Sequence, residues 1–176
     1  MKNNNLLIVG LGSIGSNLAQ FLLSCNYKVS VWDKDLSKLK NFSKRNKIKF
    51  KNKFSKNRFK NNIVILTINA GKNVDNFILK NLKFLKKIKY LIDLGNNHPD
   101  DTLRRFNFLK KNKIIYINPG FSGGIDGAKG KASLMLSCNK SQLKYLNDLF
   151  SDISGNKIKS IKLVGKKPQA GNYVKI

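Results

Sequence analysis

Short apolar runs along the chain alternate with segments in which apolar residues recur every three or four positions. The runs that predict buried strands are Leu6–Val9, Val29–Trp32, Ile63–Ile68, Tyr90–Asp93, Ile114–Ile117, Ser133–Leu136 and Ile158–Val164. Helical spacing covers Ser13–Cys25, the segment from Gly71 to Leu85, Asp100–Lys111 and Gln142–Ser151. Strands that alternate with helices in this way predict an α/β fold, with a doubly wound, mostly parallel sheet in a single domain.

Two features of the pattern limit the alternatives. The basic, polar stretch Ser37–Asn62 predicts a helix at its start and fixes little beyond it. No apolar run approaches the roughly 20 residues of a membrane span, so we expect no membrane partner and a cytoplasmic protein. Cys25 and Cys138 lie far apart without metal-ligand spacing, which favours buried free thiols over a disulfide or a metal site.

The net charge of +26 would ordinarily indicate a polyanionic partner. However, all but four of the 35 basic residues are lysine, and the lysines occur in almost every segment instead of on one stripe. This distribution is typical of an AT-rich coding sequence. We therefore do not expect a nucleic-acid partner.

A glycine motif follows the first predicted strand. Gly10, Gly12 and Gly15 form a complete Gly-x-Gly-x-x-Gly between that strand and the next predicted helix. The first glycine permits a tight turn, the second lets the backbone approach a pyrophosphate, and the third allows the helix to pack closely on the strand. The motif predicts a dinucleotide-binding fold of the Rossmann type.

Asp33 ends the second predicted strand, about 20 residues after the motif, as expected for a carboxylate that binds a ribose 2′-hydroxyl. Its charge would repel a 2′-phosphate, which favours NAD over NADP. Lys34 follows at once and would neutralise a phosphate. The sequence therefore leaves NAD and NADP open, with Asp33 favouring NAD.

Three further segments, and a fourth near the end of the chain, resemble decarboxylating 6-phosphogluconate dehydrogenases in order and spacing. They are Ile68–Gly71, the Asp-x-Gly-Asn of Asp93–Asn96 followed by the Thr-x-Arg-Arg of Thr102–Arg105, Pro119–Ala128, and Gln169–Lys175. The Ser-Gly-Gly turn within Pro119–Ala128 is shared with the wider β-hydroxyacid dehydrogenase superfamily, including 3-hydroxyisobutyrate dehydrogenases. The Asp-x-Gly-Asn and Thr-x-Arg-Arg segments are the more specific marks.

This resemblance implies a role for each matching residue. The cofactor pyrophosphate would bind at Gly10, Leu11, Gly12, Ser13, Ile14 and Gly15, and the adenosine ribose near Asp33, Lys34 and Asp35. Ile68, Asn69 and Ala70 would line the cofactor further along, and Asn96 would lie between the nicotinamide and the sugar acid. Ser122, Gly123 and Gly124 would bind the substrate, and Lys175 would be the general base.

Several positions depart from the family pattern. Leu94 replaces a glycine, Asn97 a serine, Ile125 an acidic residue and Asn172 a histidine. The implied roles of Asn96, Ser122 and Lys175 are unaffected. His98, the single histidine, we interpret as a loop residue and not as a catalyst.

The implied reaction is oxidation of 6-phosphogluconate with NAD or NADP, followed by loss of carbon dioxide to give ribulose 5-phosphate, as in the pentose phosphate pathway.

The family is homodimeric and carries a helical C-terminal domain. We therefore expect residues 1–167 to form the dinucleotide-binding domain and residues 168–176 to begin the helix that leads to that further domain, which a separate gene could encode. A cofactor-binding module without turnover, and a dehydrogenase for another β-hydroxyacid, remain alternatives. Lys175, next to the last residue, we expect to be frayed.

Overall fold

The computed structural model describes residues 4–48, 63–156 and 160–175. Within them, a five-stranded parallel sheet has the order β2-β1-β3-β4-β5. Its strands are β1 (Asn5–Val9), β2 (Lys28–Trp32), β3 (Ile63–Leu66), β4 (Tyr90–Asp93) and β5 (Tyr116–Ile117). Each predicted strand is present, and the doubly wound α/β fold is confirmed.

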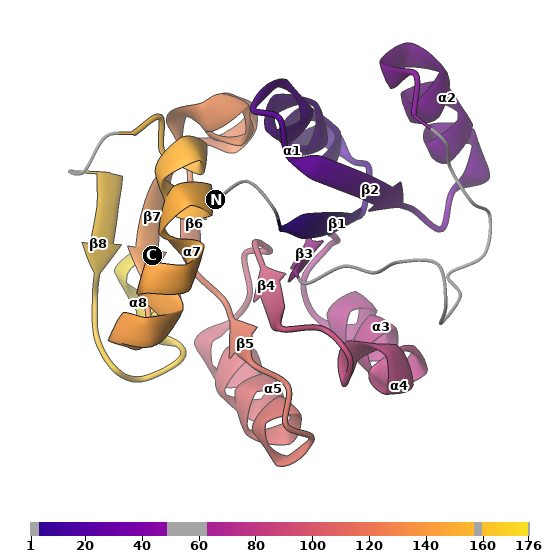
Figure 1. Cartoon of the computed structure of the whole chain (residues 1–176). Coiled ribbons are helices and arrows are strands. Elements are labelled where there is room, and N and C mark those ends of the chain that lie inside the picture. Colours follow the sequence, from indigo (N-terminus) through magenta and orange to yellow (C-terminus); the bar gives the residue numbers. More distant parts are fainter. Residues whose placement is uncertain (1–3, 49–62, 157–159, 176) are drawn as a thin grey trace.

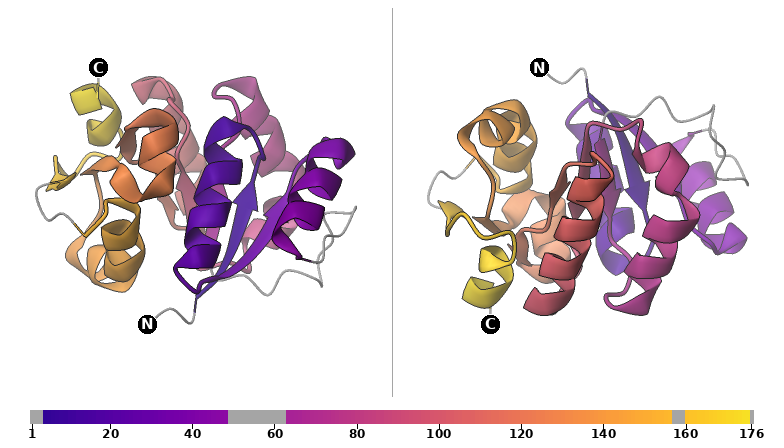
Figure 2. Two further views of the ribbon diagram at one scale, coloured as in Figure 1. Left: turned by 90° about the horizontal axis from the view of Figure 1, so that it is seen from above. Right: turned by 90° about the horizontal axis from the view of Figure 1, so that it is seen from below.

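Helices cover both faces of this sheet (Figures 1 and 2). One face carries α1 (Ser13–Ser24) and α2 (Leu36–Asn46), and the other carries α3 (Lys72–Lys80), α4 (Leu82–Leu85) and α5 (Pro99–Lys111). Alternate side chains of β1 supply the two hydrophobic cores: Leu6 and Ile8 pack on the α1 side, and Leu7 and Val9 pack on the α3 side. A strand that is apolar on both faces is what a doubly covered parallel sheet requires.

The later strands do not extend the main sheet as the sequence pattern suggested. The predicted strand Ser133–Leu136 is β7, which pairs antiparallel with β6 (Gly120–Ser122) and parallel with β8 (Ile161–Leu163) in a separate sheet. β6 was not predicted. The break between the sheets falls at Pro119, whose ring removes the N–H that a continued ladder would need.

Four more helical elements complete the described chain: α6 (Gly124–Asp126), the π-helical segment η1 (Gly127–Lys131), α7 (Lys140–Ile153) and α8 (Ala170–Lys175). η1 packs against α1, and α7 packs its buried face into the same core. Within the described part of the chain, no helix combines the length and apolarity needed to cross a membrane.

Some predicted boundaries were wrong for local reasons. The expected helix from Gly71 to Leu85 is interrupted at Asn81, which separates α3 from α4 and donates its side-chain amide to the Phe77 carbonyl. The strand expected to run to Ile68 ends at Leu66, although the Thr67 N–H still donates to the Val9 carbonyl of β1 at 2.9 Å. Part of the strand expected at Ile158–Val164 and of the stretch Ser37–Asn62 lies outside the described residues.

Candidate functional site

The glycine loop between β1 and α1 has the geometry of an anion-binding turn. Gly10 has a φ of +100°, and a Cβ on Gly15 would overlap the Gly10 carbonyl oxygen, so both positions require glycine. A Cβ on Gly12, in contrast, would meet no atom within 4 Å. The protein thus packs tightly behind the loop and leaves its outer side open at Gly12.

The N-terminus of α1 faces this open side. Gly12 is its N-cap, no side chain caps the helix, and its first turn has no acidic residue. The first N–H groups of a helix lack intrahelical partners and carry the positive end of its dipole. Since no side chain among the described residues makes a capping hydrogen bond at this end of α1, the residues present fit the pyrophosphate of a dinucleotide.

Asp33 has a structural role that the sequence did not reveal. Its side chain is 8% exposed and accepts hydrogen bonds from the Leu11 N–H at 2.5 Å and the Asp35 N–H at 2.8 Å. Asp35 in turn caps α2 by accepting from the Ser37 and Lys38 N–H groups, while Lys34 is exposed. Asp33 therefore ties the glycine loop to the end of β2. The capping role of Asp35 could have been predicted, because an aspartate just before a helix is a sequence signal for an N-cap.

The predicted cofactor segment Ile68–Ala70 lies beside the glycine loop. A Cβ on Gly10 would come within 2.9 Å of Ile68 Cγ2, and Thr67 Oγ1 donates to the Gly10 carbonyl at 2.8 Å. Asn69 and Ala70 are exposed. A Cβ on Gly95 would lie 3.4 Å from the Ile68 carbonyl oxygen. The loop that carries Asn96 is therefore next to Ile68 in space.

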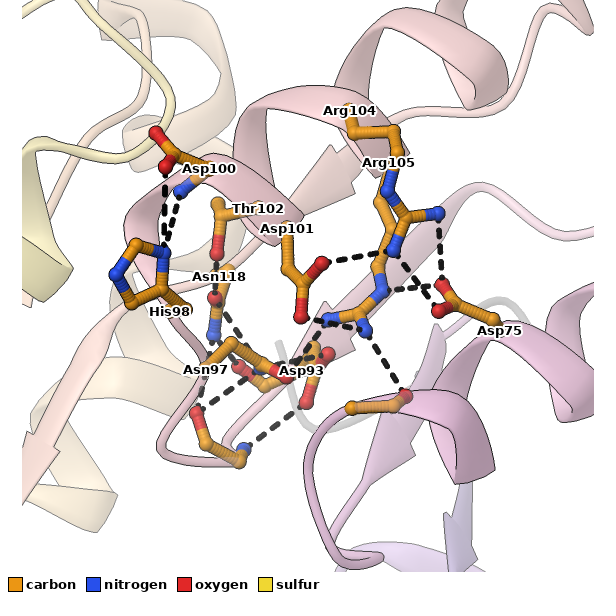
Figure 3. A network of polar contacts seen from close by, with 12 residues as sticks. Asp75, Asp93, Asn97, His98, Asp100, Asp101, Thr102, Arg104, Arg105 and Asn118 are labelled. Carbon is orange, nitrogen blue, oxygen red and sulfur yellow. Dashed lines mark hydrogen bonds and ion pairs between the residues drawn. The ribbon is translucent and has the colours of Figure 1, made fainter.

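Asn96 is exposed and forms no hydrogen bond with the described residues, whereas its neighbour Asn97 is buried in a polar network (Figure 3). Asn97 Nδ2 donates to Asp93 Oδ2 at 3.0 Å, and Asn97 Oδ1 accepts from Arg105 Nη1 at 2.7 Å. The network thus holds the backbone of this loop while the Asn96 side chain stays available to a ligand.

Asp93, at the end of β4, is the fully buried acid of this network. It accepts from the Gly95 N–H at 2.9 Å and the Tyr116 hydroxyl at 2.9 Å. Burial raises the pKa of Asp93, although these donors and Arg105 oppose the shift. Asn118 completes the network by donating to the Asp93 carbonyl and accepting from Thr102 at 2.7 Å.

The predicted substrate turn follows β6. Ser122, Gly123 and Gly124 are exposed, and Gly123 has a φ of +121°, which disfavours any other residue there. β6 packs against α8, the helix that carries Lys175. The structure therefore places the substrate turn and the predicted base on neighbouring elements.

Lys175 is not frayed as the sequence suggested. It is half-buried in α8, and this burial lowers the pKa of its ammonium group. α8 is anchored because the Gly171 backbone packs on Gly120 and Met135, and Asn172 Nδ2 donates to the Asn97 carbonyl at 3.2 Å. A short helix can be ordered by such tertiary packing even at the end of a chain.

Two other predictions concern residues outside the site. His98 is the N-cap of α5, where its Nδ1 accepts from the Asp100 N–H at 3.3 Å. This agrees with its interpretation as a loop residue. Cys25 and Cys138 are free thiols, as predicted, but both are half-buried and not fully buried.

Comparison with known proteins agrees with this geometry. Residues 5–165 match the family described as the NAD binding domain of 6-phosphogluconate dehydrogenase. The chain belongs to this family. It is 33% identical to the decarboxylating 6-phosphogluconate dehydrogenase of Buchnera aphidicola subsp. Acyrthosiphon pisum, and the match covers 100% of this chain and 39% of that relative. It is 32% identical to the decarboxylating 6-phosphogluconate dehydrogenase of Ovis aries, and the match covers 88% of this chain and 33% of that relative. The chain thus spans between a third and two fifths of these relatives.

Solved structures show the same fold, and one of them comes from a 6-phosphogluconate dehydrogenase. Plasmodium falciparum 6-phosphogluconate dehydrogenase, described with its cofactor NADP+ and its substrate 6-phosphogluconate, superposes with a TM-score of 0.84 at 27% identity, covering 97% of this chain and 38% of that chain. Mycobacterium tuberculosis 3-hydroxyisobutyrate dehydrogenase has the same fold, with a TM-score of 0.84 at 16% identity, covering 98% and 58%.

Proposed function

We propose that the chain binds a nicotinamide dinucleotide across the carboxyl edge of its five-stranded sheet. The uncapped N-terminus of α1, with open space at Gly12, carries this proposal. With the pyrophosphate there, the adenosine half lies toward Asp33 at β2, and the nicotinamide half lies over the loops that follow β3 and β4. When bound, the nicotinamide supplies a hydride acceptor.

The cofactor we propose is NAD in preference to NADP. Asp33 and Asp35 put two carboxylates beside the expected position of a 2′-phosphate, and Lys34 alone offsets them. At ~5 Å and an effective dielectric constant near 20, each repulsion is of order 3 kcal/mol before screening. Two of the roughly four acceptor positions on Asp33 are used by backbone N–H groups, which leaves acceptors for a ribose hydroxyl.

The substrate we propose is 6-phosphogluconate, in the oxidative, cytoplasmic part of the pentose phosphate pathway. Lys175 takes the proton of the substrate hydroxyl, Asn96 hydrogen-bonds between nicotinamide and substrate, and Ser122–Gly124 bind the sugar acid. A general base must be neutral before it accepts a proton, and burial changes the pKa of Lys175 in the direction that this requires.

Turnover, in this proposal, needs further residues. The chain spans 33–39% of the length of the two relatives named above. We propose that the remainder of that length supplies further site residues and the surface of the homodimer. We propose residues 1–167 as the cofactor domain and residues 168–176 as the connection to a helical domain, supplied in the same or in a separate polypeptide.

Calorimetric titration with NADH and NADPH tests cofactor binding. We expect wild type to bind NADH more tightly, and Gly12→Val to weaken NADH binding at least tenfold, about 1.4 kcal/mol. Gly12→Ala is the matched control, with a smaller group in the same open space and a smaller loss. Each variant should lower the melting temperature by only a few degrees, because nothing lies within 4 Å of a Cβ at this position and the remaining cost is that of a less favourable N-cap residue. Equal NADH affinity in wild type and Gly12→Val would refute the assigned pyrophosphate site.

A fusion to the C-terminal part of the Buchnera relative tests the reaction. The chain alone should bind NADH yet not oxidise 6-phosphogluconate, whereas the fusion should reduce NAD when 6-phosphogluconate is added. Lys175→Met in the fusion should remove turnover and keep NADH binding. A folded fusion that binds NADH without turnover would favour a binding module, and turnover only with another β-hydroxyacid would identify a sister dehydrogenase.

A further inference from the structure

Arg105 is a buried cation whose hydrogen bonds reach two separate loops and a helix. Its side chain is 2% exposed. Nε donates to Asp75 Oδ1 at 2.7 Å in the first turn of α3, Nη1 to Asn97 Oδ1 at 2.7 Å, and Nη2 to the Gly71 carbonyl at 2.9 Å. The planar guanidinium fixes the directions of these donors, so it fixes the relative positions of the three acceptors.

The acceptors belong to the segments that follow β3 and β4. Gly71 ends the loop that contains Ile68–Ala70 and is the N-cap of α3, and Asn97 lies in the loop between β4 and α5, next to Asn96. The two loops also lie close together, since a Cβ placed on Gly95 would be 3.4 Å from the Ile68 carbonyl oxygen. Figure 3 shows Arg105 reaching from α5 toward Asp75, Asp101 and Asn97. A displacement of either loop would therefore break a bond of the same side chain.

The neighbouring Arg104 offers a comparison within one helix turn. It also bonds Asp75, at 2.9 Å, but its side chain is 57% exposed, and its other partner is Asp101 on the same helix. Among the described residues, Arg104 forms no hydrogen bond with either loop, whereas Arg105 bonds both. A comparison of Arg104 and Arg105 variants can therefore distinguish the loss of an ion pair with Asp75 from the loss of the hydrogen bonds that join the two loops.

We propose that Arg105, acting through Asn97 and the Gly71 carbonyl, is a positioning residue for the nicotinamide half of the cofactor. This inference rests on the proposed function, which places that half over the loops after β3 and β4. Among the described residues, Arg105 forms no hydrogen bond with the glycine loop or with Asp33, so we expect the adenosine and pyrophosphate contacts to depend on it less than the nicotinamide contacts do. Its loss should reduce affinity for the whole dinucleotide and not for ADP, which lacks the nicotinamide half.

The test uses Arg105→Lys, with Arg104→Lys as the matched control. Lysine keeps the charge and one contact but cannot supply three fixed donors. We expect Arg105→Lys to weaken NADH by about fivefold or more while ADP stays within about twofold, and Arg104→Lys to change neither beyond about twofold. Asn97→Ser removes the same bond from its other end and should reproduce the selective loss. Equal losses for ADP and NADH, or no loss for NADH, in folded Arg105→Lys and Asn97→Ser would overturn the proposal.

Hydrogen–deuterium exchange without ligand gives an independent readout. Amides of residues 67–72 and 94–98 should exchange faster in Arg105→Lys than in wild type or Arg104→Lys, while those of residues 11–16 should not change. Unchanged exchange in both loops would also overturn the proposal. If wild type bound neither ADP nor NADH, the proposed cofactor site would be wrong, and the exchange experiment would still decide whether Arg105 holds the loops.

Discussion

Replacing Asp33 by asparagine tests whether this side chain holds the glycine loop. In the folded chain its two carboxylate oxygens accept from the N–H groups of Leu11 and Asp35, at 2.5 and 2.8 Å. Asparagine has one acceptor oxygen, so its amide nitrogen would face the second N–H and leave that donor without a partner. A hydrogen bond to a charged group contributes about 1.5–3 kcal/mol, and an unsatisfied buried donor costs a similar amount. We expect Asp33→Asn to reduce the free energy of unfolding by about 2–3 kcal/mol.

Thermal unfolding followed by circular dichroism measures this effect. For a domain of this size, about 2–3 kcal/mol corresponds to a fall of roughly 4–12 °C in the melting temperature. Asp35→Asn is the matched control, because asparagine caps a helix as well as aspartate does, and it should shift melting by only about a degree or two. Similar melting temperatures for the two variants would show that Asp33 does not hold the loop and that its role is confined to the ligand.

Two further predictions concern stability. Gly15→Ala should reduce the yield of folded protein sharply, whereas Gly12→Ala should not. The reason is that a Cβ on Gly15, but not one on Gly12, would overlap the Gly10 carbonyl and Thr67. Equal yields and melting temperatures for the two variants would contradict this prediction. Burial alone would raise the pKa of Asp75, but hydrogen bonds from Arg105 and Arg104 outweigh it and hold that pKa below its ordinary 3.8. The ionised Asp75 carboxylate therefore contributes stability above about pH 4, and this contribution is lost as pH falls through the folded-state pKa. Between about pH 2 and 6, the melting temperature of Asp75→Asn should consequently fall less steeply with decreasing pH than that of wild type.

The elements of the main sheet could be predicted because their signals are local. β4 has the predicted bounds, and α5 begins one residue earlier than predicted. The second sheet could not be predicted, because β6 has only three residues, one of them a glycine, and periodicity does not fix the direction in which two strands pair. The interruption of the helix at Asn81 likewise could not be predicted, because the apolar spacing continues from α3 into α4.

The candidate site shows the same division. The positions of the three glycines follow from their spacing, and the geometry at Gly12 and Gly15 agrees with the roles inferred from it. Asp33 was expected to point to the ribose alone, and its bonds to the backbone were not foreseen because their donors are set by the folded turn. The partners of Arg105 lie up to 34 residues away, so nothing in its neighbourhood along the chain marks it as buried.

The polar network also explains why Lys175 is ordered where the sequence suggested fraying. A six-residue helix has too few internal hydrogen bonds to be stable alone, so its order must come from tertiary contacts. One such contact joins Asn172 to the Asn97 carbonyl, and the Asn97 side chain is held by Arg105, which also holds the Gly71 carbonyl. The segments predicted to carry the base, the nicotinamide contact and the cofactor-lining residues therefore share one set of hydrogen bonds. A change at Asn97 should consequently affect both the cofactor loops and the order of α8, whereas a change at Gly12 should affect the cofactor alone.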